Sequence, residues 1–478
     1  MKAIAELKHL LNEQFGPAIL ADDAEVLAAH RGDMTENPPG QPQLVVFPDS
    51  SEQVRAVVTA AGRLRIPLTA VVANTNLGGL ANPVKGGVVV NLQRMNRILE
   101  INEADQYAVI EPGVTWQQLH DKLAAEYPGL RFAYPLSPPD TGIVPNCLMD
   151  GLANLSLRVG AAASWINALE VVLPSGELLR TGHWSYGGVP CSRSPFPALE
   201  GLFIGFVGST GIVTRMAVQL WPERRYRRRF FLMAYDVDGA YGLVKKLARM
   251  DLADDLGTLS LAAGKMLFGE YRPTWRDPAE PLVFCYIDLS ADDEELFRIK
   301  QKVVERFIVE QRRQGVKLDG PLDMDDLVRM EPLFAKFADF PTRLDFLLDH
   351  PGGGLTWVGT YGPTSRFEEG FRRGAEILDR HGLPPVVVCR PMQGGHFGVL
   401  RWITVFDKND AGEVELVRRV NAELADMAVE LGFFPYKTPQ WVWERYADRL
   451  DPVFRRLVGE VKKLLDPQGI MNPGHLEL

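Results

Sequence analysis

A chain of 478 residues is long enough for two or three domains with buried cores. Hydrophobic residues make up 46% of it and charged residues 24%, which is typical of a globular protein. The net charge of −9, without a long Lys/Arg run, argues against nucleic acid and anionic membranes as partners.

The chain begins with a pattern typical of an amphipathic helix, because Ile4, Leu7, Leu10 and Leu11 fall on one face. This start has neither the apolar core nor the cleavage site of a signal peptide. No segment has the apolar length of a membrane span. The cysteines also lack metal-ligand spacing, so we expect reduced thiols, no metal site and a cytoplasmic protein. They are Cys147, Cys191, Cys285 and Cys389.

Short β-runs joined by turns and capped helices make up the first half. Residues 43–72 predict a strand, a helix and a strand, and the helix begins at a capping box of Ser50 and Gln53. A second capping box, Thr115 to Gln118, begins another helix. Residues 168–182 predict a hairpin with Ser175-Gly176 at its tip, and residues 211–222 predict a closing strand.

Longer helices follow a short basic run at residues 223–230, which we expect to be solvated surface. The pattern of strands between these helices predicts an α+β region. The predicted helices cover residues 239–250, 292–314, 365–382 and 411–432, and the predicted strands cover residues 281–290, 355–362 and 400–408. Residues 451–478 predict one helix and a Pro/Gly-rich end.

A loop without charged residues, "NTNLGG" at residues 74–79, separates two of the β-runs. Backbone N–H groups bind a pyrophosphate closely only where side chains are small, and this loop meets that condition. It is neither a dinucleotide-binding GxGxxG nor a Walker loop, because a strand rather than a helix follows it. A plain turn is the alternative interpretation.

Two further stretches, residues 135–156 and 203–216, are also poor in charge and rich in small residues. Three such loops in one half of a chain suggest a single extended ligand that lies between them. The alternative is that all three are only connections between elements.

Five motifs then resemble the FAD-linked oxidases of the vanillyl-alcohol oxidase and p-cresol methylhydroxylase family, in the family's order. They are "SSEQVRAVV", "VVVNLQRMNRILEINEADQYAVIEPGVTWQQL", "NALEVVLPSGELLRTG", "GSTGIVTRMAVQLWP" and "LLDPQGIMNPGHLEL". The resemblance implies an α+β fold with a two-part FAD-binding domain of the PCMH type, residues 1–222 and 433–478. A cap or substrate domain, residues 223–432, is inserted between the two parts.

The resemblance also implies which residues bind FAD. The loop at 74–79 matches the pyrophosphate loop, and segments near residues 112, 142, 208 and 472 match others that line the cofactor. The implied residues are Asn74, Thr75, Asn76, Leu77, Gly78, Gly79, Pro112, Gly113, Thr141, Gly142, Gly208, Ser209, Gly211, Ile212, Val213 and Asn472.

Covalent attachment of the flavin is not expected. Relatives with a covalent flavin often use a cap-domain histidine or tyrosine, and Gly354 falls at that histidine position here. Tyr361 and His350 lie seven residues after it and four before it, so neither matches. We therefore predict non-covalent FAD.

The substrate side resembles phenol-oxidising members at Tyr436 and Lys437, where they place Tyr and Arg to bind a phenolate. A cation with a hydroxyl donor stabilises phenolate and favours hydride departure from the para carbon. Asp140 falls roughly where such members keep an aspartate near the flavin, although it also fits a turn. The loop tyrosine that completes their site has no match at residues 74–83, which weakens the phenol interpretation.

Three residues of one Gly-containing segment are further candidates. His396 can act as a base near neutral pH, or it is a turn histidine. Arg390 and Gln393 can hold a carboxylate or carbonyl of the substrate, and surface roles fit them equally.

The leading hypothesis is an FAD-dependent oxidoreductase that takes hydride from a para-substituted phenol or a related aromatic alcohol. The runner-up is a 2-hydroxy-acid dehydrogenase on the same fold, with Lys437, Arg390 or another cation on the carboxylate. A third hypothesis is a non-catalytic flavoprotein or scaffold subunit. No motif specifies whether oxygen, a cytochrome or another carrier accepts the electrons, and we expect a homodimer or a small complex.

Overall fold

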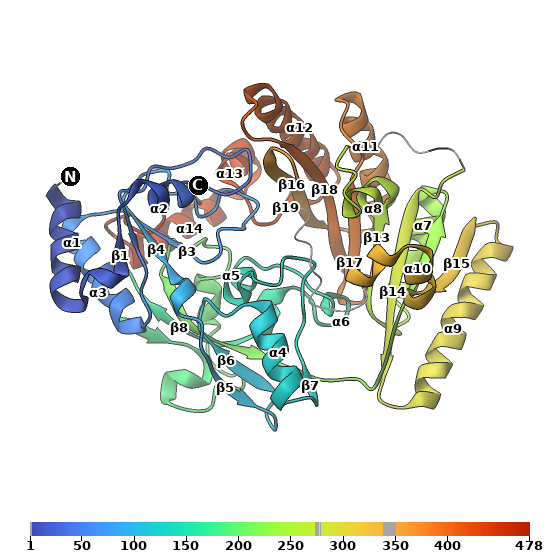
Figure 1. The fold of residues 1–478 in the computed structure, drawn as a ribbon, viewed down its shortest axis with the longest axis horizontal. Coiled ribbons are helices and arrows are strands. Elements are labelled where there is room, and N and C mark those ends of the chain that lie inside the picture. Colours follow the sequence, from blue (N-terminus) through green and yellow to red (C-terminus); the bar gives the residue numbers. More distant parts are fainter. Residues whose placement is uncertain (1, 273–276, 278, 338–349) are drawn as a thin grey trace.

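Two groups of β-sheets lie side by side in the computed structural model, which describes residues 2–272, 277, 279–337 and 350–478 (Figure 1). The first group uses strands from residues 20–222. Its four-stranded sheet has the order β1 (Leu20–Ala21), β2 (Leu44–Val46), β4 (Val88–Asn91), β3 (Leu68–Val71). Its five-stranded sheet has the order β5 (Ile98–Asn102), β6 (Tyr107–Ile110), β10 (Ile212–Gln219), β8 (Ile166–Val172), β9 (Leu178–Arg180), and β7 (Leu130–Arg131) pairs with β11 (Trp221–Pro222).

The second group is one eight-stranded sheet, antiparallel throughout. Its order is β15 (Leu318–Asp323), β12 (Tyr226–Ala234), β14 (Val283–Ala291), β13 (Ala253–Ser260), β17 (Val387–Met392), β18 (Phe397–Asp407), β16 (Gly353–Gly362), β19 (Phe434–Pro435). Buried residues of this sheet form one core with those of four long helices. These helices are α7 (Val237–Ala248), α9 (Glu294–Arg313), α11 (Phe367–Arg380) and α12 (Ala411–Glu430).

The remaining α-helices lie before residue 223, between the strands of the eight-stranded sheet, or in the C-terminal segment. Those before residue 223 are α1 (Lys2–Phe15), α2 (Ala24–Ala29), α3 (Ser51–Leu64), α4 (Trp116–Glu126), α5 (Ile143–Leu148) and α6 (Ser156–Val159). The others are α8 (Leu261–Leu267), α10 (Met324–Met330), α13 (Gln440–Arg445) and α14 (Pro452–Leu465). No helix in the described part of the chain is long and apolar enough to cross a membrane.

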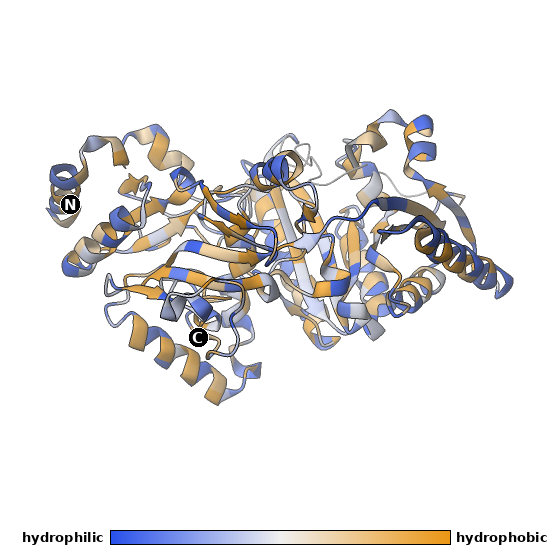
Figure 2. Cartoon of the chain, turned by 90° about the horizontal axis from the view of Figure 1, so that it is seen from below, coloured by the Kyte–Doolittle hydropathy of each residue, from blue (hydrophilic) through white to orange (hydrophobic). Residues whose placement is uncertain are grey.

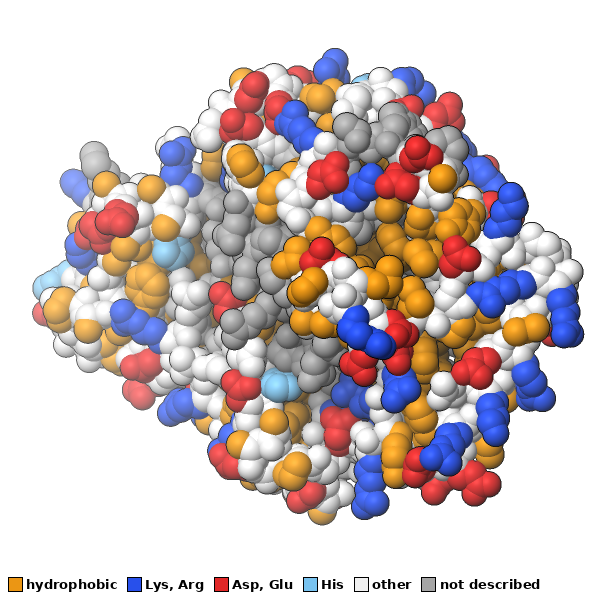
Figure 3. Space-filling model, turned by 45° about the vertical axis from the view of Figure 1, so that its right-hand side comes forward, with side chains coloured by type: hydrophobic (Ala, Val, Ile, Leu, Met, Phe, Trp, Pro, Cys, Tyr) orange, Lys and Arg blue, Asp and Glu red, His pale blue; other side chains and the backbone are white. Residues whose placement is uncertain are grey.

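Hydropathy follows this architecture. In Figure 2 the strands inside the molecule are largely hydrophobic, whereas the outer helices alternate hydrophobic and hydrophilic residues. On the face seen in Figure 3, acidic and basic side chains are interspersed. The interior is therefore apolar, as expected for a globular chain of this composition.

One of the predicted helix features is confirmed, and two differ in detail. Thr115 begins α4 with the predicted reciprocal capping box. Ser50 caps α3, but the Gln53 side chain accepts a hydrogen bond from the Asp49 N–H at 2.9 Å instead of closing the box. On α1, Leu7 and Leu11 are buried but Leu10 is 41% exposed, so the apolar face is narrower than predicted.

The predicted hairpin at residues 168–182 is confirmed as β8 paired with β9, and Gly176 adopts a positive φ of 85° at its tip. The uncharged stretch at residues 135–156 is not a simple loop, because it contains α5. Pro145 at the start of a helix needs no N–H donor, so it is compatible with this short element.

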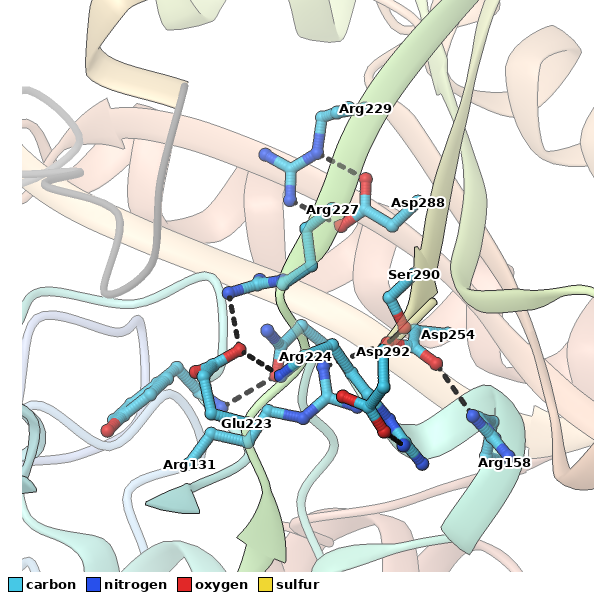
Figure 4. A network of polar contacts seen from close by, with 12 residues as sticks. Arg131, Arg158, Glu223, Arg224, Arg227, Arg229, Asp254, Asp288, Ser290 and Asp292 are labelled. Carbon is cyan, nitrogen blue, oxygen red and sulfur yellow. Dashed lines mark hydrogen bonds and ion pairs between the residues drawn. The ribbon is translucent and has the colours of Figure 1, made fainter. Parts of the chain in front are cut away.

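The basic run at residues 223–230 is not uniformly solvated, which corrects the prediction for that segment. It leads into β12, where alternate side chains point to opposite faces. The Arg229 side chain is only 9% exposed and forms two hydrogen bonds to Asp288, at 2.6 and 2.7 Å. Figure 4 shows this pair above Arg224, which pairs with Asp292.

A buried carboxylate joins the two groups of sheets (Figure 4). Asp254 of β13 accepts from Arg131 of β7 at 2.8 Å, from Arg158 of α6 at 2.9 Å and from Ser290 of β14 at 2.5 Å. Burial raises the pKa of Asp254, but the Arg131 charge and these hydrogen bonds outweigh it and lower the pKa to about 2. The carboxylate is therefore ionised at neutral pH, and it links Arg131 and Arg158 to the eight-stranded sheet.

We expect Asp254→Asn to lower the free energy of unfolding by roughly 3 kcal/mol near neutral pH, because it leaves Arg131 without its buried partner. Since the native pKa lies below the unfolded value of 3.8, the carboxylate's contribution is present above that value and is lost as the pH falls toward about 2. Urea unfolding of both proteins at about pH 7 and about pH 2.5 measures it.

The matched control is Asp292→Asn, which removes the half-exposed partner of Arg224. We expect it to change stability by less than about 1 kcal/mol. If Asp254→Asn lowered the free energy of unfolding as much at the lower pH as at neutral pH, the charge of Asp254 would not be the source of the stabilisation.

Candidate active site

One cavity lies between the three uncharged loops. It contains about 1470 Å³ of space not filled by atoms, including its open mouth. The loops contribute residues 70–77, most of 136–149 and several of 203–213, and Leu355, Trp357 and Lys437 contribute from the other group of sheets. The three stretches that the sequence singled out therefore border one space.

The backbone N–H groups of the loop at residues 74–77 donate to no acceptor among the described residues. They belong to Asn74, Thr75, Asn76 and Leu77. Successive free N–H groups in a loop form a concavity that binds anions. This arrangement suits a pyrophosphate.

Asp33 holds the same loop from behind. Its carboxylate accepts from the N–H of Gly79 at 2.7 Å and of Thr35 at 2.9 Å, and its own N–H donates to the Asn82 side chain. Its backbone carbonyl accepts from Lys408, which follows β18. These contacts position the loop without using the donors that face the cavity.

Two asparagines at the cavity each have one buried polar atom without a partner. Asn76 Oδ1 and Asn146 Nδ2 have no hydrogen-bond partner among the described residues, and both side chains border the cavity. Buried polar atoms are nearly always paired in native proteins. A bound ligand with both donors and acceptors would satisfy them.

Asn472 of the C-terminal tail joins two of the loops. Its side-chain amide donates to the carbonyl of Leu80 at 2.9 Å and to that of Val207 at 2.7 Å. Its backbone N–H donates to Leu68 of β3. The tail therefore fixes the spacing of the cavity walls.

The structure places most predicted cofactor residues on the cavity. Those that border it are Asn74, Thr75, Asn76, Leu77, Pro112, Thr141, Gly142, Gly208, Gly211, Ile212 and Val213. Gly78, Gly79, Gly113, Ser209 and Asn472 lie next to this lining. Their assignment to the cofactor stays a prediction for each residue.

A cationic and aromatic cluster forms the opposite wall. On β16, Trp357 and Tyr361 share a face, and Gly359 between them pairs with Arg401 of β18. The Tyr436 N–H donates to Gly359, which places Tyr436 and Lys437 directly after β19. The Tyr436 ring stacks on Tyr361, with ring centres 4.5 Å apart.

Arg401 and Lys437 lie near one ring. The Arg401 guanidinium is 4.1 Å from the centre of the Trp357 ring and donates a hydrogen bond to the Tyr436 hydroxyl. The Lys437 ammonium is 5.8 Å from the same ring centre. Burial, and secondarily the Arg401 charge, lower the pKa of Lys437 to about 8.

Neither cation has a carboxylate partner in the parts of the chain that the structure describes. Two positive charges that are desolvated together destabilise each other. An anionic ligand would relieve this repulsion. The wall is therefore suited to a flat anion.

Of the predicted catalytic and substrate residues, Lys437 borders the cavity, whereas Tyr436 and the others lie outside its lining. Arg390 is buried, and it donates to Asp255 and to the Ala153 carbonyl at 2.6 Å each. Gln393 and His396 are exposed in the turn before β18, and Asp140 is exposed in the turn before Thr141. Roles for these residues stay predictions.

The residues considered for flavin attachment are placed similarly. Gly354 pairs with Phe406 in the sheet. His350 is buried against Tyr271, and the Tyr361 hydroxyl donates to the Asp150 carbonyl at 2.6 Å. Neither His350 nor Tyr361 is part of the cavity lining. Non-covalent attachment remains a prediction.

Several residues of the site were not predicted from the sequence. Arg401 had a weak signal, because it is a charge inside an apolar strand. Trp357 had none, and Asp33 lies in an irregular segment between α2 and β2. Asp150 is a further one: it is largely buried behind Met149 of the cavity, and burial raises the pKa of its carboxyl.

Comparisons with known proteins agree with this geometry. A family model for the FAD binding domain matches residues 42–182, and one for the C-terminal domain of FAD linked oxidases matches residues 444–476. The D-lactate dehydrogenase of Anaerostipes hadrus is 30% identical over 461 residues, which cover 91% of this chain and 90% of that protein. This chain belongs to the FAD-linked oxidases.

The fold of this FAD-linked oxidase is confirmed by solved structures. It is similar to p-cresol methylhydroxylase with substrate bound, with a TM-score of 0.88 and 20% identity over 100% of this chain and 97% of that one. It is similar to 4-ethylphenol oxidase from Gulosibacter chungangensis, with a TM-score of 0.86 and 22% identity over 99% and 97%. An FAD-linked oxidoreductase of Mycobacterium tuberculosis is 31% identical over 228 residues, about half the length of each chain.

The PCMH-type fold, the FAD cofactor and membership in an oxidoreductase family are thus confirmed. The free donors at residues 74–77 and the unpaired amides of Asn76 and Asn146 fit FAD. The loop N–H groups would hold its pyrophosphate, and the uncharged walls would hold its rings.

We expect Gly78→Ala to weaken FAD binding about tenfold. A Cβ at Gly78 would lie 2.8 Å from the Lys437 carbonyl oxygen, so the loop and the segment after β19 would have to move apart. Titration of the apoprotein with FAD measures the dissociation constant. Gly201→Ala is the control, since a Cβ there meets nothing within 4 Å, and an equal effect of both changes would contradict the explanation.

We expect the affinity for an aromatic anion to fall as the pH rises through about 8, because Lys437 loses its charge there. Benzenesulfonate is a suitable probe, since it stays ionised over this range. Its dissociation constant, measured by calorimetry at about pH 6 and about pH 10, should rise in the native protein but not in Lys437→Arg. A pH dependence that Lys437→Arg retains would assign the titration to another group.

Proposed function

We propose that this chain oxidises a para-substituted phenol or a related aromatic alcohol at the carbon attached to the ring. The observation that carries the proposal is the pair of cations, Arg401 and Lys437, which have no acidic partner in the described structure and lie beside an aromatic wall. When bound, FAD supplies the hydride acceptor. The chain's own residues bind and activate the substrate.

Tyr436 completes the phenolate subsite that we propose. Its hydroxyl oxygen accepts a hydrogen bond from Arg401, so its proton is free to be donated to the ligand. Donation from Tyr436 and the charge of Lys437 would both favour the ionised phenol. An ionised phenol releases hydride from its para carbon more readily, because the negative charge stabilises the developing product.

The ring walls support an aromatic substrate over a small aliphatic one. Trp357 borders the cavity, and flat ligands stack on aromatic rings with favourable dispersion energy. Arg401 joins Trp357 to the stacked rings of Tyr361 and Tyr436, because its guanidinium lies near both the Trp357 and the Tyr436 ring. Relatives with this fold include p-cresol methylhydroxylase and 4-ethylphenol oxidase, whose names specify phenols.

A second candidate is the oxidation of a 2-hydroxy acid. It is favoured by one observation, the 30% identity to a D-lactate dehydrogenase over 91% of this chain. The same two cations would then hold the substrate carboxylate. Arg390 is less suited to this role, because Asp255 already neutralises it.

We also propose that residues 1–222 and 433–478 bind FAD while residues 223–432 cover the substrate. Support for the first boundary comes from the sheets, since every strand of the first group precedes residue 223. The second boundary is less sharp, because β19 (Phe434–Pro435) is the last strand of the eight-stranded sheet. The tail contact of Asn472 with Leu80 and Val207 supports the assignment of the C-terminal segment to the FAD side.

The deciding experiment mixes the FAD-loaded protein anaerobically with 4-ethylphenol and, separately, with D-lactate. Loss of the oxidised flavin absorbance with the phenol alone supports the proposal, and loss with D-lactate alone supports the second candidate. Absence of reduction by a broad panel of both classes would contradict both and favour a non-catalytic flavoprotein.

We expect Lys437→Met to weaken binding of the reactive substrate by roughly 2 kcal/mol, or about thirtyfold, since a charge-assisted contact is lost. Lys437→Arg is the matched control and should retain most of the affinity, because it keeps the charge. Equal loss in both variants would show that the charge of Lys437 is not what binds the substrate.

A further inference from the structure

The amine of Lys437 is unlike that of a lysine with a structural role. It reaches toward the Trp357 ring beside the cavity, and none of the described residues accepts a hydrogen bond from it. Lys462 offers a contrast, because its ammonium donates to the carbonyls of His475 and Leu476 at 3.0 and 2.9 Å. The nitrogen of Lys437 therefore has no protein group to displace before it reacts.

The surroundings favour the neutral form of this amine. The Arg401 guanidinium lies 4.1 Å from the centre of the ring that Lys437 also faces, and it is the one charge that acts on Lys437 among the described residues. Burial and the Arg401 charge lower the pKa of Lys437 to about 8, so a useful fraction is neutral near pH 7. A desolvated lysine next to a second cation is the arrangement that makes an amine nucleophilic toward carbonyl carbons.

We propose that Lys437 is a covalent binding site for aromatic aldehydes, which it captures reversibly as imines. The proposal rests on the proposed function in one respect, namely that aromatic aldehydes are the oxidised form of aromatic alcohols. The Trp357 ring, which borders the cavity and lies 5.8 Å from the Lys437 ammonium, suits the ring of such an aldehyde. The site would thereby retain or sense the oxidised product.

The chemistry balances without an oxidant or a reductant. The neutral nitrogen of Lys437 adds to the carbonyl carbon, and a proton moves from nitrogen to oxygen to give a carbinolamine. The C–O bond then breaks, a C=N bond forms, and the oxygen leaves as water. The Tyr436 hydroxyl, which accepts from Arg401, is the adjacent donor for the departing oxygen.

The test uses benzaldehyde, whose carbonyl is its only polar group, and sodium cyanoborohydride, which reduces imines to stable amines. The FAD-loaded protein is treated at about pH 7, digested, and its lysines are mapped by mass spectrometry. We expect benzylation at Lys437 well above that of other lysines, and protection when benzenesulfonate occupies the site. Labelling at Lys437 no greater than at exposed lysines would overturn the proposal.

Two variants separate a reactive lysine from one that is merely accessible. Lys462→Arg, the matched control, should leave the labelling of Lys437 unchanged. Arg401→Gln removes the neighbouring charge, so the pH at which labelling is half-maximal should move upward toward the ordinary lysine value of about 10.4. Retained FAD absorbance reports that the variant is folded, and an unchanged pH profile in folded Arg401→Gln would overturn the proposal.

Failure of this proposal is distinguishable from failure of the proposed function. A protein whose flavin is reduced by 4-ethylphenol but whose Lys437 is not labelled retains the function and lacks the imine site. A protein whose Lys437 is labelled but whose flavin no phenol reduces has the imine site and another oxidation substrate.

Discussion

The hydrogen bonds from the loop at residues 74–79 to the carboxylate of Asp33 are the contacts on which the cavity depends. They hold the loop through Gly79, while the N–H groups of residues 74–77 have no partner among the described residues. Asp33 is in turn fixed by Asn82 and Lys408, and Lys408 extends from the eight-stranded sheet. Asp33 therefore joins the loop, through its carboxylate, to the end of β18, through its backbone carbonyl.

The cluster of Arg401 and Lys437 carries positive charge that no described acidic residue neutralises. Arg401 and Lys437 are brought together by β16, β18 and β19 without a neutralising acid among the described residues, whereas Arg390, Arg131 and Arg229 each have a buried aspartate partner. The three buried arginines are thus neutralised by aspartates, whereas Arg401 and Lys437 keep their charges without an acidic partner in the described structure. This contrast distinguishes charges that hold the fold from charges that are open to a ligand.

Local patterns predicted the parts of the fold that depend on neighbouring residues. The capping box at Thr115, the turn at Ser175-Gly176 and the long amphipathic helices follow from hydrogen bonding and periodicity within a few residues. The solvated run at 223–230 was predicted wrongly for Arg229, because the partner that buries it, Asp288, lies in another strand and is 59 residues away. Likewise, no local pattern relates Arg401 to Tyr436, which meet only through β16.

The amino-acid sequence by itself determined the cofactor side: small uncharged loops can approach a phosphorylated ligand closely, and this property belongs to the residues themselves. Their convergence on one cavity, the role of Asp33 behind them and the tie made by Asn472 were decided by the tertiary structure, because each contact joins segments far apart in the chain. The same holds for the state of Lys437. The sequence shows that this position is a lysine. Its lowered pKa results from the tertiary structure, which buries the amine near Arg401.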